Sequence, residues 1–309
     1  MKYISPKEAA ARWKMNERTV RRYCEKGTID GCAQVAGLWI IPDDAPKPQI
    51  PDAKPPVYKG PAKQVVAQRA KNYHFGIYEY LQVNLAYSSS RMASNRLTRN
   101  QVSELYRTGK ISVAFEPMKV DDIVEIDNHF QACTYVIDNL LEPLHTAHLR
   151  KLHRLLFYGT VGDRNGSIRT GELRESNHSY GMSPAEIQTA LADLIKSYES
   201  KKTVSIEDIL DFHVQFEKIR PFEDGNGRLG RLIMMKECLR HQIVPFIIDD
   251  KNRGKYHKGI VAWPANPELL TEVISHAQAH FEGKMDLCRT LQYNRPETGR
   301  GSQNGGKKK

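Results

Sequence analysis

The chain has few cysteines, and they show none of the usual paired spacings. The 309 residues include five cysteines, an odd number without a CxxC pair. They are Cys24, Cys32, Cys133, Cys238 and Cys288. Such a scattered set argues against a disulfide framework and favours reduced thiols. No run of eighteen apolar residues occurs, and the start, MKYISPKEAAARW, lacks the apolar core of a signal peptide. We therefore expect a soluble cytoplasmic protein that does not associate with membranes.

One common phosphate-binding motif is also absent. The chain contains no GxxxxGK[ST] of a P-loop, and its one GxGxxG, at residues 225–230, follows a predicted helix and not the strand of a Rossmann fold. Its charge nevertheless favours phosphate as a partner, because 46 basic residues against 36 acidic ones leave a net charge of +10. The length allows one large domain and one small one.

One short run, IRPFEDGNGRLGR at residues 219–231, concentrates groups that bind phosphate. Pro221 interrupts the chain and an apolar segment follows Arg231, so the glycines are predicted to lie in a loop that opens a helix. Backbone N–H groups at a helix N-terminus favour an anion. Arg228 and Arg231, one turn apart, can bind the same anion, and Asp224 offers the hard oxygen that Mg²⁺ prefers beside phosphates. The run predicts a pyrophosphate cradle; the alternative is a glycine-rich turn before a core helix.

The same run resembles the Fic family signature, HxFx[DE]GNGRxxR, at every position but the first. The resemblance covers roughly residues 75–280 and implies an all-α Fic fold with a small β-hairpin flap, here at residues 159–182. It also implies ATP and Mg²⁺ as cofactors and transfer of AMP to a Ser, Thr or Tyr hydroxyl of an unknown target protein. Asp224 would hold the metal. The implied nucleotide-binding residues are Phe222, Gly225, Asn226, Gly227, Arg228 and Arg231.

The departure from the signature affects the catalytic base. The family histidine, which takes the proton from the target hydroxyl, is replaced by Arg220, so the implied catalytic positions are Arg220 and Asn226. An arginine stays protonated at ordinary pH and cannot accept a proton. Loss of a general base costs roughly 10²–10⁴-fold in rate. The sequence thus predicts either a slow adenylyltransferase or an inactive, nucleotide-sensing domain that regulates transcription.

A second stretch, SSRMASN at residues 89–95, resembles the inhibitory helix of the Fic family, [ST]xxxE[GN]. The matching positions are Ser90, Ala93 and Asn95, and the inhibitory glutamate falls on Ala93. In the family that glutamate pairs with the last arginine of the signature, here Arg231. The resemblance therefore implies that this brake is missing and that removal of AMP from a target is disfavoured.

Residues 1–42 read as a separate small module. Two short helices joined by a tight turn precede β-rich runs around Gly31 and Gly37, and the module resembles the winged helix-turn-helix of the MerR or excisionase type. Its predicted DNA-binding residues are Arg18, Thr19, Arg21 and Arg22. Eight basic residues against four acidic ones give +4, so tight DNA binding needs a homo-oligomer or a second element. The alternatives are a protein-docking unit and a helical module with a solvated basic face.

Seven prolines within residues 42–61 predict a semi-rigid linker at 43–61. Residues 62–295 then form the predicted Fic domain, and residues 296–309 a disordered basic tail. A buried stripe of Ile209, Phe212 and Phe216 is predicted on the helix that leads to the motif, and 229–240 is predicted to be the central helix.

The histidines are predicted to have neither a catalytic nor a metal-binding role. His145, His148 and His153 are expected to face solvent or cap a helix. His213 is expected to be hydrogen-bonded in the core, too far from position 220 to replace the base. His276 and His280, at i and i+4, are expected on a helix surface and not at a zinc ion, because no HExxH occurs.

Overall fold

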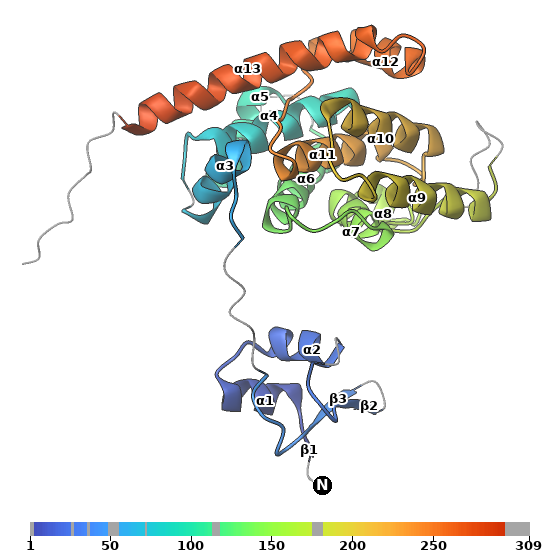
Figure 1. Ribbon diagram of the computed structural model, residues 1–309. Coiled ribbons are helices and arrows are strands. Elements are labelled where there is room, and N and C mark those ends of the chain that lie inside the picture. The colour runs from blue at the N-terminus through green and yellow to red at the C-terminus, as the bar shows by residue number, and fades with distance from the viewer. Residues whose placement is uncertain are drawn as a thin grey trace, which may run out of the picture. The chain divides into compact units, whose positions relative to one another are not determined.

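The chain divides into two compact units at Val57/Tyr58 in the computed structural model (Figure 1). The structure describes residues 3–25, 28–35, 38–48, 56–71, 73–112, 118–174 and 182–293. For residues 291–293 it describes the backbone alone. The division falls within the predicted linker. Gly37, most of the linker's centre and the predicted tail lie outside the described residues. No described helix is both long enough and apolar enough to cross a bilayer.

The smaller unit consists of two helices and a three-stranded antiparallel sheet. Its elements in chain order are β1 (Tyr3–Ile4), α1 (Pro6–Trp13), α2 (Glu17–Glu25), β2 (Ala33–Val35) and β3 (Leu38–Pro42), with β3 in the middle of the sheet. Ser5 and Glu8 form a capping box at the start of α1, and Pro6 is its first residue. A small core of Ala9, Trp13, Val20 and Ile41 joins the helices to the sheet. The helices match the predicted pair, and the winged helix-turn-helix assignment stays a prediction.

The larger unit is mostly helical in its described residues. Its helices are α3 (Gly60–Ala70), α4 (Ile77–Met92), α5 (Arg99–Thr108), α6 (Val120–Asp138), α7 (Thr146–Phe157), α8 (Val161–Arg164), α9 (Pro184–Glu199), α10 (Ile206–Ile219), α11 (Asn226–Arg240), α12 (Arg253–Ala262) and α13 (Glu268–Tyr293), with a 3₁₀ turn at Asp250–Asn252. Several begin at capping boxes, among them Thr98 with Gln101 and Ser205 with Asp208. The all-α prediction for this unit is confirmed.

Helix α11 lies at the centre of the larger unit, as its nearly continuous apolar sequence predicts. It packs against α3, α4, α6, α7 and α10, and Figure 1 shows it enclosed by its neighbours. Ile209, Phe212 and Phe216 on α10 are buried, so the predicted stripe is confirmed. Because α10 and α11 pack closely, the turn between them has a rigid base on both sides.

The predicted hairpin flap is not formed by the described part of residues 159–182. Val161–Arg164 is a short helix, and turns and irregular chain follow up to Arg174; residues 175–181 lie outside the described residues. Thr160 caps this helix, which the glycine-rich composition did not indicate. The segment docks on the motif loop: the Arg174 N–H donates to the Pro221 carbonyl at 2.8 Å, and Arg169 pairs with Glu223 at 3.1 Å.

Candidate nucleotide-binding site

Two left-handed residues shape the loop between α10 and α11. Arg220 ends α10 at φ 46°, and its N–H donates to the Phe216 carbonyl at 3.0 Å. Pro221 cannot continue the helix, as predicted, although the residue before it adopts a left-handed conformation and not the extended one that a following proline usually favours. Gly225, at φ 72°, starts α11. The two reversals bring the chain back so that α11 packs on α10.

The side chain of Asn226 fastens this loop from inside. Its amide donates to the Phe222 carbonyl at 2.8 Å, and its carbonyl oxygen accepts from the Phe222 N–H at 3.0 Å. Phe222 has no exposed surface and stacks on the His153 ring, with centroids 4.2 Å apart. The structure therefore places Phe222 and Asn226, two predicted site residues, as supports of the loop, with neither side chain open to a ligand.

His153 joins the loop to the segment that docks on it. Its Nε2–H donates to the Asp224 carbonyl at 3.1 Å, while its Nδ1 accepts from the Gly171 N–H at 2.8 Å. Burial lowers the pKa of His153 to about 4, so the imidazole is neutral and one tautomer satisfies both bonds. The expectation that His153 faces solvent or caps a helix is wrong, because its exposed fraction is 0%.

The start of α11 presents backbone donors. Its first intrahelical bond runs from the Leu229 N–H to the Gly225 carbonyl at 2.9 Å, which leaves the N–H groups of residues 226–228 for a ligand. Glycine is required at 225, since a Cβ there would lie 2.3 Å from Cε2 of Phe157. At Gly227 a Cβ would lie 3.0 Å from Nη1 of Arg231. Both glycines therefore let the backbone come close to the groups around it.

Arg228 is buried at the start of α11 and has an N–H group without a hydrogen-bond partner. Its side chain is 4% exposed, and its Cζ lies 4.6 Å from the centroid of the Phe157 ring. Nη1 is 3.1 Å from Oε1 of Glu125, and Nη2 is 3.5 Å from Oδ2 of Asp224, but Nε has no hydrogen-bond partner. A buried guanidinium with an unpaired N–H is suited to accept an anionic ligand.

Arg231 contacts the helix that resembles the inhibitory element. Its Nε donates to the Ser89 hydroxyl at 2.9 Å and its Nη2 to the Ser89 carbonyl at 3.1 Å. Ala93 lies one turn further along, just past the end of α4, where a longer acidic side chain could reach the same guanidinium. Within the described parts of the chain, no carboxylate forms an ion pair with Arg231.

The other two positions of that element have structural roles. The Ser90 side chain is buried, and its hydroxyl has no hydrogen-bond partner. Asn95 donates to the Asp122 carbonyl at 2.9 Å and to Glu125 at 3.3 Å, which ties the end of α4 to α6. Ser89, and not the predicted Ser90, is thus the residue at the arginine, and it is also the serine that lies four positions before Ala93, as the pattern [ST]xxxE requires.

The Asp224 carboxylate is open to solvent beside the start of α11. Its side chain is 62% exposed, and its Oδ1 accepts from the Gly225 N–H at 2.6 Å. One exposed carboxylate beside a phosphate-binding helix start is the kind of partial ligand set that Mg²⁺ uses when it binds with a nucleotide. The residues present therefore fit magnesium, and Asp224 is the residue that would hold it.

Comparison with known proteins agrees with this geometry. Residues 143–238 match the sequence model of the Fic/DOC family, a span that begins just before α7 and ends within α11. The larger unit contains a Fic/DOC domain. A protein adenylyltransferase, fic-1 of Caenorhabditis elegans, is 21% identical over 212 residues, which cover 64% of this chain and 39% of that protein. The protein adenylyltransferase Fic of Drosophila willistoni is 24% identical over 176 residues, 55% of this chain and 34% of that protein.

Solved structures share the fold. A Fic domain containing signaling protein from Bacteroides thetaiotaomicron aligns with a TM-score of 0.58 at 17% identity, over 76% of this chain and 98% of that one. Residues 134–508 of the Caenorhabditis elegans Fic-1 align with a TM-score of 0.58 at 18% identity, over 74% of this chain and 72% of that one. The chain spans about two fifths or less of the length of the curated relatives it matches.

The Fic/DOC domain has no histidine at the lip of its loop. Arg220 is exposed there, and the nearest histidine in sequence, His213, is fully buried and bonded to the Tyr256 hydroxyl, as predicted. Burial, with a smaller effect from Arg231, lowers the pKa of His213 to about 3. His213 is therefore a neutral core residue that does not replace the family base.

Two buried or partly buried titratable residues near α11 were missed in the sequence. His129 on α6 is fully buried, neither of its ring nitrogens has a partner, and burial together with Arg231 and Arg228 lowers its pKa to about 3. Burial raises the pKa of Glu217, while Arg231 and Arg220 oppose this effect. Neither residue belongs to the signature. Only their position on the apolar faces of their own helices could have indicated that they lie near α11.

The predicted DNA-binding residues lie on α2 of the smaller unit. Arg18, Arg21 and Arg22 are exposed and Thr19 is half-buried, while Val20 and Cys24 face the core. Arg21 pairs with Glu17 at 2.8 Å, which leaves Arg18 and Arg22 as the more available cations. Their role in DNA binding stays a prediction.

Proposed function

We propose that this chain binds ATP with Mg²⁺ at the start of α11 and transfers AMP to a protein hydroxyl, slowly. The observation that carries the proposal is the pair Arg228, whose Nε has no partner, and Arg231, which hydrogen-bonds to the neutral Ser89, beside the N–H groups of residues 226–228. Curated relatives named protein adenylyltransferases support the reaction class. The larger unit alone would bind the nucleotide, since all these groups belong to it.

The arrangement suits nucleotide transfer at the α-phosphorus. The attacking hydroxyl oxygen forms a bond to that phosphorus as the bond to the bridging oxygen breaks, and pyrophosphate leaves. Arg228, Arg231 and the helix start neutralise the charge that grows on the leaving group. Mg²⁺ held by Asp224 would supply additional positive charge to the phosphates.

The proton of the hydroxyl has no acceptor at position 220. The guanidinium of Arg220 stays charged at any working pH, so the proton must leave to water. We attribute a rate loss of roughly 10²–10⁴-fold to this difference. Ala93 leaves the phosphate side open, so the proposed activity is limited by chemistry and not by an inhibitory glutamate.

Restoring the base tests this function. Arg220→His is expected to raise transfer of α-labelled AMP to protein at least about a hundredfold over the unaltered chain. Arg220→Gln is the control, because it removes the charge without supplying a base and should give no such gain. Equal, background labelling by Arg220→His and Arg220→Gln, with ATP binding intact, would refute the transferase proposal.

A second function is favoured by the exposed arginines of α2. In this alternative the chain is a nucleotide-sensing regulator, and Arg220 serves as one more phosphate donor. The absence of a base at 220 and of a glutamate at 93 fits a site that binds without reacting. Two results together would favour the regulator over the transferase. ATP would change the affinity of the chain for DNA, and the Arg220→His variant would transfer no AMP.

A further inference from the structure

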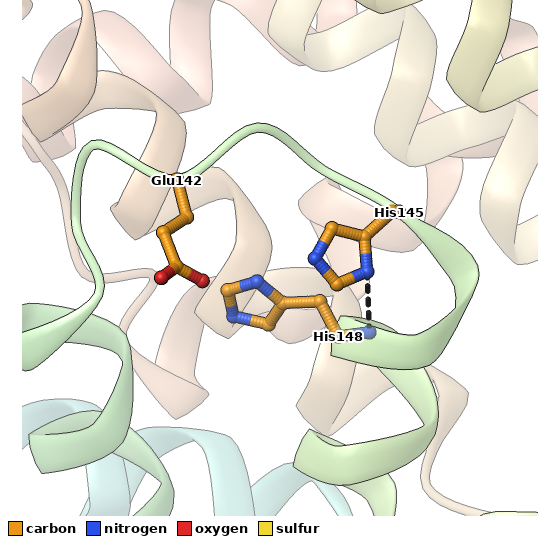
Figure 2. A group of neighbouring side chains, drawn as sticks. All are labelled: Glu142, His145 and His148. Atoms are coloured by element: carbon orange, nitrogen blue, oxygen red, sulfur yellow. Dashed lines mark hydrogen bonds between the residues drawn. The ribbon is translucent and has the colours of Figure 1, made fainter. Parts of the chain in front are cut away.

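Three possible metal ligands gather where the chain enters α7. Glu142 lies in the loop after α6, His145 is the N-cap of α7, and His148 lies in its first turn. One ligand atom from each lies within 4.8 Å of the other two, the only such trio of His, Cys, Asp or Glu among the described residues. Figure 2 shows the His148 ring between the Glu142 carboxylate and the His145 ring.

His148 is the unusual member of the trio. It is 0% exposed, and neither of its ring nitrogens has a hydrogen-bond partner. Its neighbours are rings: Tyr135 at 5.3 Å and His145 at 5.5 Å between centroids. A buried imidazole without any partner is costly, and a metal bond would satisfy one of its nitrogens.

A hydrogen bond fixes the backbone at Glu142, whereas the side chains of Glu142 and His145 can rotate. The buried Lys236 donates to the Glu142 carbonyl at 2.6 Å, and its charge is balanced by Glu237 at 2.8 Å. Glu142 and His145 are exposed, so both can rotate toward His148. Ligand atoms around a tetrahedral zinc lie about 3.4 Å apart, which requires closure of little more than 1 Å.

Metal binding would exchange one contact of His145 for another. Its Nδ1 now accepts from the His148 N–H at 3.0 Å, which places the proton on Nε2 (Figure 2). Coordination through either nitrogen removes this acceptor, because the other nitrogen must then carry the proton. The site therefore couples metal binding to the cap of α7.

We propose that Glu142, His145 and His148 bind a divalent transition metal, with zinc as the best match. Two imidazoles and one carboxylate suit Zn²⁺ and not the oxygen-seeking Mg²⁺. The three ligands leave a fourth position for water. The site is separate from the nucleotide loop, although α7 also carries His153, five residues or about 7.5 Å further along the helix.

The test measures zinc bound by the full chain. Protein treated with a chelator and desalted is equilibrated with Zn²⁺, passed over a sizing column and assayed for metal. We expect about one zinc per chain, and with Co²⁺ the visible absorption of a tetrahedral site. His145→Asn keeps a side chain that caps the helix but loses the imidazole, and Glu142→Gln keeps the shape but loses the charge. Each should weaken zinc binding at least about tenfold.

The matched control addresses the other histidine pair. His276→Ala with His280→Ala removes the exposed i, i+4 pair of α13 and should leave zinc binding unchanged. Circular dichroism checks that every variant is folded. Absence of zinc from the unaltered chain, full binding by both His145→Asn and Glu142→Gln, or loss of zinc in the α13 variant would each overturn the proposal.

Discussion

Arg220 places a fixed positive charge where a reversible proton acceptor would serve AMP transfer. The residue stands at the lip of the loop with its side chain exposed, while the groups beneath it are buried. Burial raises the pKa of Glu217, which lies one turn earlier, and the positive charges of Arg231 and Arg220 reduce this rise. Arg220 therefore strengthens the positive field that favours phosphate, at the same position where it removes the base.

The buried histidines predict a loss of stability in mild acid. His129 and His213 have pKa values of about 3 in the folded chain, because burial disfavours their charged forms, against ~6.5 when unfolded. Below pH 6.5 the unfolded chain therefore binds protons that the folded chain does not. The free energy of unfolding should fall by up to ~1.4 kcal/mol per pH unit for each histidine as the pH decreases. Urea unfolding at several values between pH 7 and 5 measures this.

Variants separate the contribution of one histidine. His129 has no hydrogen bond to lose, so His129→Leu should reduce the slope of stability against pH by about one proton. His276→Gln, at an exposed site, should leave the slope unchanged. Stability that is constant from pH 7 to 5 in the unaltered chain would contradict the burial argument.

At the scale of elements, the start of α11 depends on a glycine with two constraints. Gly225 is left-handed, and a Cβ there would meet Phe157 at 2.3 Å. Gly225→Ala should lower the free energy of unfolding by about 3 kcal/mol, from backbone strain and overpacking together. The matched control is Gly109→Ala, since Gly109 is also left-handed but has nothing within 4 Å; it should cost only about 1 kcal/mol. Equal losses in thermal or urea unfolding would mean that the Phe157 contact is unimportant.

The signature predicted this element well because its chemistry is local. Glycines, arginines and a proline at fixed spacing specify a loop and a helix start, and the structure has both. The supports come from distant residues: His153 holds Asp224 from 71 positions away, and Ser89 holds Arg231 from 142 positions away. The burial of His148 and His153 could have been predicted, because each lies four residues from a leucine, Leu152 and Leu149, on the apolar face of α7. The composition of residues 159–182 did not indicate the short helix that Thr160 caps, and the flap stays a prediction because residues 175–181 lie outside the described part of the chain.

At the scale of the whole molecule, the chain joins a basic small unit to a Fic/DOC domain. If α2 binds DNA, about four phosphate contacts are available from a net charge of +4, so affinity should fall about a hundredfold between 50 and 200 mM salt. Binding of a labelled duplex at several salt concentrations tests this. Arg22→Ala should reduce the logarithmic slope by about one, whereas Lys63→Ala in the larger unit should not. An affinity that does not depend on salt would remove the DNA-binding prediction.

The nucleotide site is the central claim, and it is independent of whether AMP is transferred. Calorimetric titration of the chain with Mg-ATP tests it most directly. Arg231→Ala removes two donors at the proposed phosphate position and should weaken binding about ten- to a hundredfold. Arg231→Lys keeps the charge, so its affinity for Mg-ATP should lie between those of the unaltered chain and Arg231→Ala. Lys63→Ala should bind Mg-ATP as tightly as the unaltered chain. Unchanged affinity in folded Arg231→Ala would contradict the account.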